Sequence, residues 1–123
     1  MSDLISWLYN FAFKKGISVE QTKLLSPDTP STSFPQAKLI IINANWHDPN
    51  EIPFIIAHEI GHVINQDDIH SPQAEMAASF TALHLLRKYC DANDIPTDNS
   101  IRFCSLFGIP FKYDHLVRQV LAS

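Results

Sequence analysis

Positive charge is scarce in this 123-residue chain, which has 9 lysines and arginines against 13 aspartates and glutamates. The net charge of −4 leaves no basic stripe that could release counterions from a phosphate backbone, so direct nucleic-acid binding is not expected. No segment approaches the roughly 18 consecutive apolar residues of a membrane helix, so no membrane association is expected either. A signal peptide is not expected either, because Asp3 stands where a positive start belongs and Asn10 interrupts the apolar run.

Cysteine is equally rare. The two cysteines, Cys90 and Cys104, lack a C-x-x-C or other metal-type spacing. Since no leader is expected, they are most simply interpreted as reduced, buried thiols, which predicts a cytoplasmic protein. The length and the 46% hydrophobic content fit a single globular domain over residues 1–123, and they leave the oligomeric state open.

The first third of the chain alternates between clear and weak structural signals. The apolar residues of 3–15 share one helical face, and Gly16 ends this helix. Residues 17–25 form at most a weak strand. Three prolines in residues 26–35 predict a loop, whereas the β-branched run over 38–43 predicts a strand.

The rest of the chain is expected to be helical. Asp48 and Pro49 predict the entry to one helix, and Ser71 with Pro72 predict the start of the next. This second helix is apolar nearly all round and is therefore expected to run through the core. Two shorter helices are expected over residues 98–107 and 114–122. The predicted fold class is α+β, with helices packed on a small sheet.

The stretch "IAHEIGHVINQDD", residues 56–68, holds two histidines four apart, with a glutamate directly after the first. Residues four apart on a helix lie about 40° apart around its axis, so His58 and His62 can point at one metal ion. Zn²⁺ at roughly 2.0–2.1 Å from each nitrogen fits this separation. Glu59 lies beside the metal, where it could move a proton from an activated water to a leaving amine. The pattern indicates a catalytic zinc helix with Glu59 as the base.

A purely structural histidine pair is the alternative to this interpretation. Three ionisable groups within five residues of an apolar helix are costly to bury unless something neutralises them. Gly61 also argues against an ordinary core helix. Glycine costs about 1 kcal/mol against alanine inside a helix, so another element is expected to approach closely there.

A catalytic zinc site needs a third protein ligand and leaves the fourth position to water. Glu75 is the first choice, because it is expected to be a buried carboxylate in an apolar helix. Its alternative role is an exposed acid stabilised by the helix dipole. Asp68 competes, since it follows His62 by the six residues of metzincin-type sites, although that class has a glycine where this chain has Asn65. His70 is a weaker candidate.

The other histidines are expected to lie elsewhere. His84 follows Glu75 by nine residues and so falls on the opposite side of that helix, where it cannot share a metal with Glu75. His47 and His115 are expected to be surface or capping residues. Asp67 could orient a ligand histidine from outside the ligand shell.

With the motif placed, the segment "KLIIINANWHDPNEIPFIIAHEIGHVINQ" resembles the core of the ImmA/IrrE family of metallopeptidases. That family shows a strand ending in Asn, a polar link and a Phe-x-x-Ala-His-Glu-(Leu/Ile)-Gly-His helix. The similarity extends through "EMAASFTALHLLRK", weakens after about residue 90 and is loose in the tail. It covers these matching residues: Phe54, Ala57, His58, Glu59, Gly61, His62, Glu75, Ala77, Phe80, Ala82 and Leu85.

The resemblance implies a zincin-like domain with His58, His62 and Glu75 on Zn²⁺ and Glu59 as general base. It also implies an endopeptidase whose protein substrate is a specific regulator, typically a DNA-binding repressor of a phage or mobile element. The chain departs from the family at Ala78, where the family has Asn, and at residues 86–87, where it has Met-Pro. These departures leave the implied ligands intact.

A peptidase of this kind is expected to bind its substrate in extended form, added to the edge strand near Lys38 to Asn43. Tyr113 and His115 are candidates for stabilising the oxyanion. The rival function is a non-enzymatic module, zinc-stabilised or degenerate, that binds a regulatory or toxin–antitoxin partner. A closed site, with Glu75 and Asp68 both joining the two histidines, would indicate that rival.

Overall fold

A computed structural model describes residues 3–67 and 69–123. Its mixed composition of helices and a small sheet confirms the predicted α+β class. Eight helices and strands follow one another in this order: α1 (Asp3–Lys14), β1 (Ser18–Thr22), β2 (Thr32–Phe34), β3 (Leu39–Asn43), α2 (Ile52–Asn65), α3 (Pro72–Ala92), α4 (Ser100–Phe107) and α5 (Asp114–Ala122). Short 3-10 turns add Pro35–Ala37, Pro49–Glu51 and Phe111–Tyr113.

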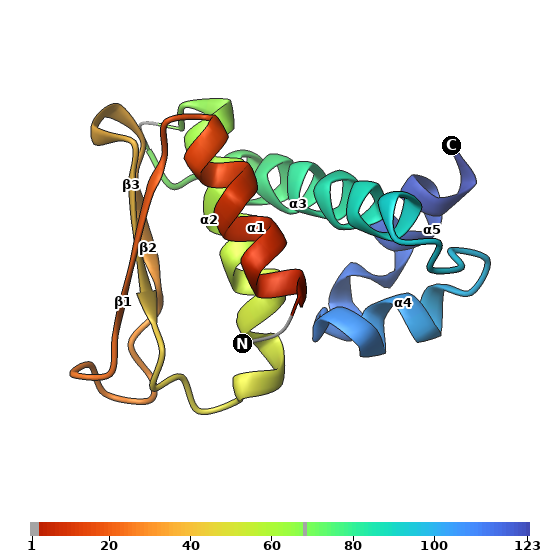
Figure 1. Ribbon diagram of the computed structural model, residues 1–123, viewed down its shortest axis with the longest axis horizontal. Helices are drawn as coiled ribbons and strands as arrows, with labels where there is room; N and C mark the ends of the chain where they lie inside the picture. Colours follow the sequence, from red (N-terminus) through yellow and green to blue (C-terminus); the bar gives the residue numbers. More distant parts are fainter. Residues whose placement is uncertain (1–2, 68) are drawn as a thin grey trace.

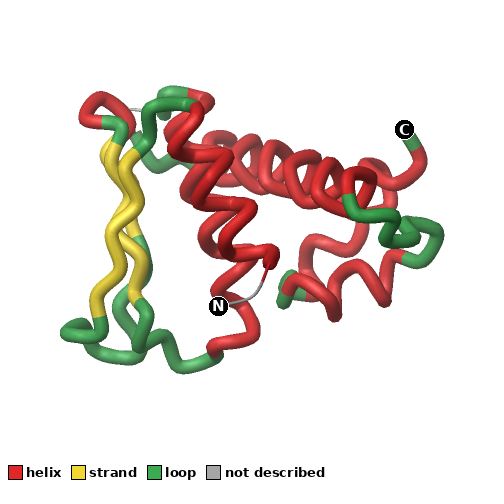
Figure 2. Tube along the Cα trace, viewed as in Figure 1, coloured by secondary structure: helices red, strands yellow, loops and turns green. Residues whose placement is uncertain are grey.

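The sheet stands at one end of the molecule and the helices extend away from it. Helices α1 and α2 cover one face of the sheet, and α3 runs from there to α4 and α5 at the far end (Figure 1). The same division into a strand layer and a helical body is visible in the trace coloured by secondary structure (Figure 2). The apolar face predicted for the first helix is confirmed, because Leu4, Leu8 and Ala12 are buried.

The sheet corrects two predictions. Its strand order is β1-β3-β2, with β1 parallel and β2 antiparallel to β3. The strand predicted at 38–43 is therefore central, and the expectation that it forms an edge is wrong. The loop predicted over 26–35 contains the edge strand β2, which is too short, at three residues, to show an alternating pattern. Pro30 and Pro35 flank it, as suits an edge strand that need not donate on both sides.

The entry to α2 follows the predicted capping. Asp48 accepts a hydrogen bond from the backbone N–H of Asn50, and Pro49 opens a 3-10 turn that leads directly into the helix. Pro53 lies in the first turn of α2, where its missing N–H costs nothing. The helix then carries the histidine motif into the interior, with Ile56, Ala57 and Ile60 buried.

The close approach expected at Gly61 is confirmed. A Cβ atom at this position would lie 2.6 Å from the backbone oxygen of Ala78, so α3 packs directly against the glycine of α2. Ala78, which stands where the resembled family has Asn, is itself fully buried. The contact fixes the distance between the two helices that carry His58 and Glu75.

We expect Gly61→Ala to destabilise the protein. Alanine favours the helix by about 1 kcal/mol, but overpacking against backbone typically costs about 1–3 kcal/mol and the Ala78 carbonyl cannot rotate away. Urea unfolding should show a lower midpoint with an unchanged slope. A midpoint above that of the wild type would mean that the helices separate at little cost.

Helix α3 corrects the prediction that it runs through the core. Its inner side is buried, but Met76 is 47% and Phe80 41% exposed, and the rings of His84 and Phe80 contact each other edge-to-face on the outer side. The apolar run conceals this asymmetry because hydrophobic residues occupy both faces. Arg87, at a departure from the resembled family, donates to the backbone oxygens of Val120 and Ser123 and so ties α3 to the end of α5.

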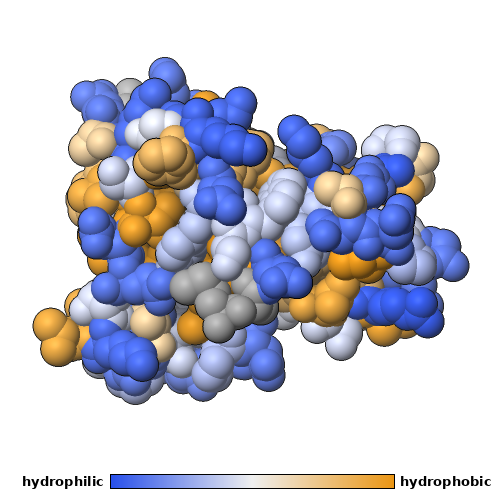
Figure 3. Space-filling view, in the orientation of Figure 1, coloured by the Kyte–Doolittle hydropathy of each residue, from blue (hydrophilic) through white to orange (hydrophobic). Residues whose placement is uncertain are grey.

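The two cysteines are unpaired, as predicted. Cys90 is buried and Cys104 half-buried, and burial raises the pKa of the Cys90 thiol to about 11. On the face seen in Figure 3, hydrophobic groups are interspersed with hydrophilic ones. None of the helices in residues 3–67 and 69–123 combines the length and apolar content needed to cross a membrane.

Candidate metal centre

His58 and His62 lie one turn apart on α2 and face the start of α3. Their ring centroids are 4.7 Å apart and the ring planes are nearly perpendicular, at 89°. His62 is 1% exposed, and the His58 side chain is 13% exposed. Burial is the main cause that lowers the pKa of His58, and the neighbouring His62 lowers it further. The His58 ring is therefore available as a neutral imidazole, the form that binds metals.

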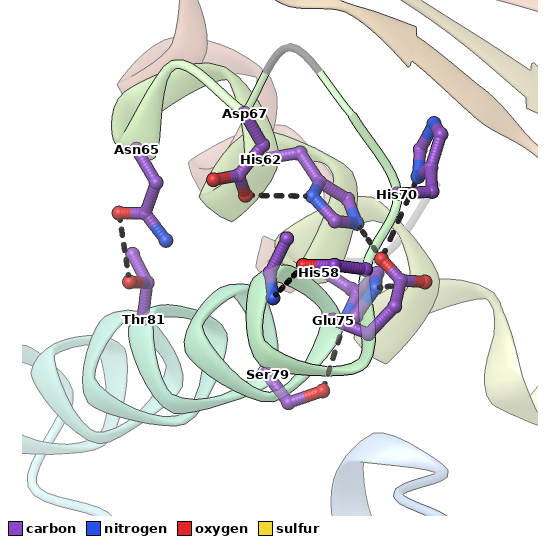
Figure 4. A network of polar contacts seen from close by, with 10 residues as sticks. His58, His62, Asn65, Asp67, His70, Glu75, Ser79 and Thr81 are labelled. Atoms are coloured by element: carbon purple, nitrogen blue, oxygen red, sulfur yellow. Dashed lines mark hydrogen bonds and ion pairs between the residues drawn. The ribbon is translucent and has the colours of Figure 1, made fainter.

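Each imidazole has a partner at its Nδ1 atom. His62 Nδ1 donates to Asp67 Oδ2 at 2.9 Å, and His58 Nδ1 shares a hydrogen bond of 3.1 Å with Ser79 Oγ (Figure 4). Gln66 adopts the left-handed conformation at φ 56, which turns the chain so that Asp67 N also bonds the backbone oxygen of His62. Such partners fix the ring orientation and leave the Nε2 lone pair free to bind a metal.

Both Nε2 atoms face Glu75, which lies in the first turn of α3 behind the cap Ser71. Glu75 Oε1 is 3.6 Å from His58 Nε2, and Oε2 is in close contact with His62 Nε2. Because the Nδ1–H of His62 donates to Asp67, the Nε2 atom of His62 carries a lone pair. This lone pair faces the carboxylate oxygen of Glu75. Two electron-rich atoms in contact need a cation or a proton between them. The arrangement therefore fits a bound metal ion.

The exposure of Glu75 corrects the reason given for choosing it. Its side chain is 47% exposed, so the expectation of a buried carboxylate is wrong. The Glu75 carboxyl loses some solvation, which raises its pKa, but His62, His58 and His70 together outweigh this effect and lower the pKa. Glu75 lies at the mouth of the site and reaches inward, because the first turn of α3 is open to solvent on its outer side.

Glu59 lies on the inner side of the histidines. It is 7% exposed, and burial raises the pKa of its carboxyl to about 8, which the nearby Ser33 hydroxyl of β2 partly opposes. The Ser33 hydroxyl and Glu59 Oε1 do not form a well-aligned hydrogen bond, and neither atom has another partner within the described ranges. A buried carboxyl poised near neutral pH is suited to accept and return protons.

This pKa gives a pH dependence to the metal-free protein. A folded pKa of about 8, above the ordinary 4.5, means that Glu59 favours folding below pH 4.5 and loses this contribution as the pH rises through 8. Between pH 4.5 and 8, we expect the free energy of unfolding of chelator-treated wild type to fall by up to roughly 5 kcal/mol relative to that of Glu59→Gln, at about 1.4 kcal/mol per pKa unit. Chemical unfolding at several pH values measures the difference. Parallel profiles for the two proteins would place the Glu59 carboxyl in a solvated environment.

Two overlapping trios have potential ligand atoms within 4.8 Å of one another. One is His58, Glu59 and His62, and the other is His62, His70 and Glu75. His70 lies between α2 and α3, with Nδ1 3.7 Å from Glu75 Oε2. Imidazole and carboxylate donors in this number suit Zn²⁺. Asp68, the competing candidate, lies outside the described residues.

A hollow of about 500 Å³ opens over these side chains. His58, Glu59 and Glu75 line its floor, and residues 30–32, at and before the edge strand β2, line one wall. Trp46 and Ile55 also line it, and Trp46 Nε1 donates to Glu51 Oε1 at 2.8 Å. The potential ligands therefore line a space that a peptide could enter beside β2, which lies at the edge of the sheet in the described part of the chain.

The remaining histidines lie away from the metal centre, whereas Tyr113 lines a hollow next to it. His84 is on the outer side of α3, and His47 lies near Asp28 at 3.7 Å on the surface. His115 is exposed and lines neither this hollow nor its neighbour. Tyr113 packs on Phe54, with ring centroids 5.4 Å apart, at the neighbouring hollow.

Sequence reasoning missed two hydroxyl groups of the site. Ser79 follows Glu75 by four residues on α3, so the helical spacing alone could have placed both side chains on the face toward His58. Ser33 gave no such signal, because its position beside Glu59 depends on the antiparallel pairing of β2 with β3.

Comparison with protein families matches residues 12–98 to the peptidase family M78, described as the IrrE N-terminal-like domain. The match spans well over half of the chain and contains α2 and the start of α3 together. The chain belongs to this family. Comparison with curated proteins and with solved structures gave no match. Membership of the IrrE-like peptidase family supports a metallopeptidase-type function, and a peptidase family implies a protein substrate.

Proposed function

We propose that this protein is a zinc-dependent endopeptidase in which His58, His62 and Glu75 bind the metal and Glu59 is the general base. The contact of both Nε2 atoms with the single carboxylate of Glu75 carries the proposal. The donor set matches the two-histidine, one-glutamate ligation of catalytic zinc sites, which keep a fourth position for water.

Bound Zn²⁺ would polarise the scissile carbonyl and lower the pKa of a water molecule. Glu59 takes the proton of the attacking water and delivers it to the leaving amine. Its burial suits this role, because a desolvated carboxylate takes up a proton more readily than one in water. Asp67 and Ser79 hold the two imidazoles in place from the opposite side of each ring.

The substrate is proposed to bind as an extended strand against β2. This strand pairs with β3 on one side and, within the described residues, with no strand on the other, and Thr32 lines the hollow over the site. An added strand would satisfy its backbone groups and pass over Glu59. As the family resemblance implies, the substrate is proposed to be a specific regulatory protein, such as a DNA-binding repressor of a phage or mobile element, met in the cytoplasm.

The proposed activity is tested by sequencing new protein N-termini in a host-cell lysate treated with the zinc-loaded protein. A few cleavage sites in one or a few proteins are expected, all absent with Glu59→Gln. Identical N-termini in both samples would count against a peptidase.

A closed, non-catalytic zinc module that binds a regulatory or toxin–antitoxin partner is the second candidate. His70 favours it, since its Nδ1 is 3.7 Å from Glu75 Oε2 and four protein donors would fill a tetrahedral site.

The variant His70→Ala separates the two candidates. The peptidase proposal expects the variant to retain about one zinc at unchanged affinity, because three ligands remain. The visible spectrum of the cobalt-substituted protein should also be unchanged. A large loss of zinc affinity together with an altered cobalt spectrum would assign the fourth position to His70 and support the closed module.

A further inference from the structure

A second hollow of about 480 Å³ adjoins the metal centre on the side away from β2. It shares Trp46, Ile55, His58 and Glu59 with the hollow described above, so the two form one continuous depression that crosses the histidine motif. An extended peptide whose scissile bond lies at Glu59 would therefore place neighbouring residues in both halves.

The far wall of this second hollow comes from the turn between α4 and α5. Pro110, Lys112 and Tyr113 supply it, and all three lie beyond the residues that match the family. Gly108 anchors this turn, because a Cβ atom there would lie 1.7 Å from the backbone oxygen of Asn50. The turn thus packs directly on the chain that enters α2 and holds a fixed position relative to the metal centre.

The lining of the second hollow is mainly apolar and aromatic. Phe54 and Tyr113 contact each other with ring centroids 5.4 Å apart, and Trp46, Ile55 and Pro110 extend the apolar surface. Glu51 is committed to the indole N–H of Trp46. Lys112 brings a positive charge to this lining, and its ammonium lies 5.2 Å from the centroid of the Tyr113 ring. Burial is the main cause that lowers the pKa of His58, and the charge of Lys112 makes a smaller contribution in the same direction.

We propose that this second hollow is a specificity pocket that binds a bulky apolar side chain, aromatic by preference, of the residue next to the scissile bond. Rings on its walls offer edge-to-face contacts to an incoming ring. Lys112 at the rim disfavours a cationic side chain. The proposal rests on the proposed peptidase function and adds the class of substrate residue that the enzyme selects.

The test measures binding of three hydroxamates to the zinc-loaded full chain by calorimetry. All carry the same metal-chelating group, and they differ in one side chain: methyl, benzyl or 4-aminobutyl. We expect the benzyl compound to bind at least about 10-fold more tightly than the methyl compound, because it buries an aromatic ring. The 4-aminobutyl compound should bind no better than the methyl compound.

Variants assign the preference to the pocket. Tyr113→Ala should reduce the benzyl preference to about threefold or less, whereas Tyr113→Phe should keep it. Phe111→Ala is the matched control, since Phe111 belongs to the same turn, is 78% exposed and does not line the hollow. The wild-type comparison tests the proposal even if Tyr113→Ala does not fold.

Each contrary result has a separate meaning. Equal affinity for the methyl and benzyl compounds would overturn the specificity pocket and leave the metal centre in place. Tighter binding of the 4-aminobutyl compound than of the methyl compound would have the same meaning. A benzyl preference unchanged in folded Tyr113→Ala places the ring elsewhere and also overturns the pocket. Failure of all three compounds to bind overturns both this proposal and the peptidase function.

Discussion

Glu59→Gln is expected to reduce cleavage of the protein substrate by about 10²–10⁴-fold, the range that general acid–base groups contribute. Glutamine keeps the size of the side chain and removes its ability to take up a proton. Because Glu59 is not among the proposed ligands, the zinc content should stay at about one per chain. Cleavage rates of wild type and variant at equal zinc loading measure the effect.

Glu20→Gln is the matched control, because Glu20 is an exposed carboxyl on β1, the edge strand away from the metal centre. It should cleave at the wild-type rate. Loss of zinc from Glu59→Gln would instead point to the trio His58, Glu59 and His62 as the ligand set. Retained activity in the zinc-loaded variant would remove Glu59 from the chemistry altogether.

Glu75→Ala is expected to weaken zinc binding by at least about 100-fold, more than the loss of a residue that only supports a ligand. The carboxylate contacts both Nε2 atoms, so its removal leaves two imidazoles without the anionic ligand. Competition with a chromophoric chelator gives the dissociation constants, and the isolated variant should lose most of its metal.

Asp91→Ala offers a comparison on the same helix. Asp91 is 64% exposed near the far end of α3, beside Arg87, and its removal should leave zinc affinity unchanged. Undiminished zinc in Glu75→Ala would show that another donor, His70 or Asp68, completes the site. In that event the proposed three-ligand set would be wrong.

The histidine motif was the most predictable part of the site. Its i, i+4 spacing acts within one helix, so His58 and His62 could be placed side by side without knowledge of the fold. Asp67 could be suggested only as a supporting residue, because its bond to His62 depends on the left-handed turn at Gln66. The relative position of two side chains can thus be predicted from the sequence when both lie on the same helix.

Glu75 shows where this reading becomes indirect. Its selection assumed burial, yet the side chain is half-exposed and reaches the histidines because α3 packs closely on α2 at Gly61. Gly61 predicted that an element approaches, but not which one. The family resemblance implied Glu75 as a ligand independently of the argument from burial.

The edge strand of the sheet and the walls of the two hollows could not be predicted, because they depend on tertiary contacts. Three residues of β2 form a strand only because β3 pairs with them, and the prolines around them masked that signal. The apolar run of α3 did not reveal that Met76 and Phe80 face solvent, since only neighbouring elements decide which side is covered. Likewise, Tyr113 lines the second hollow because Gly108 packs against Asn50 and so positions the turn between α4 and α5.

The most direct test of the central claim is an anomalous difference map of zinc-loaded crystals, recorded at the zinc absorption edge. One peak per chain is predicted, roughly 2.0–2.2 Å from Nε2 of His58, Nε2 of His62 and a carboxylate oxygen of Glu75, with a non-protein fourth ligand. A peak ligated by His70 as well would contradict the open catalytic site, and the absence of any peak at the motif would contradict the metal centre itself.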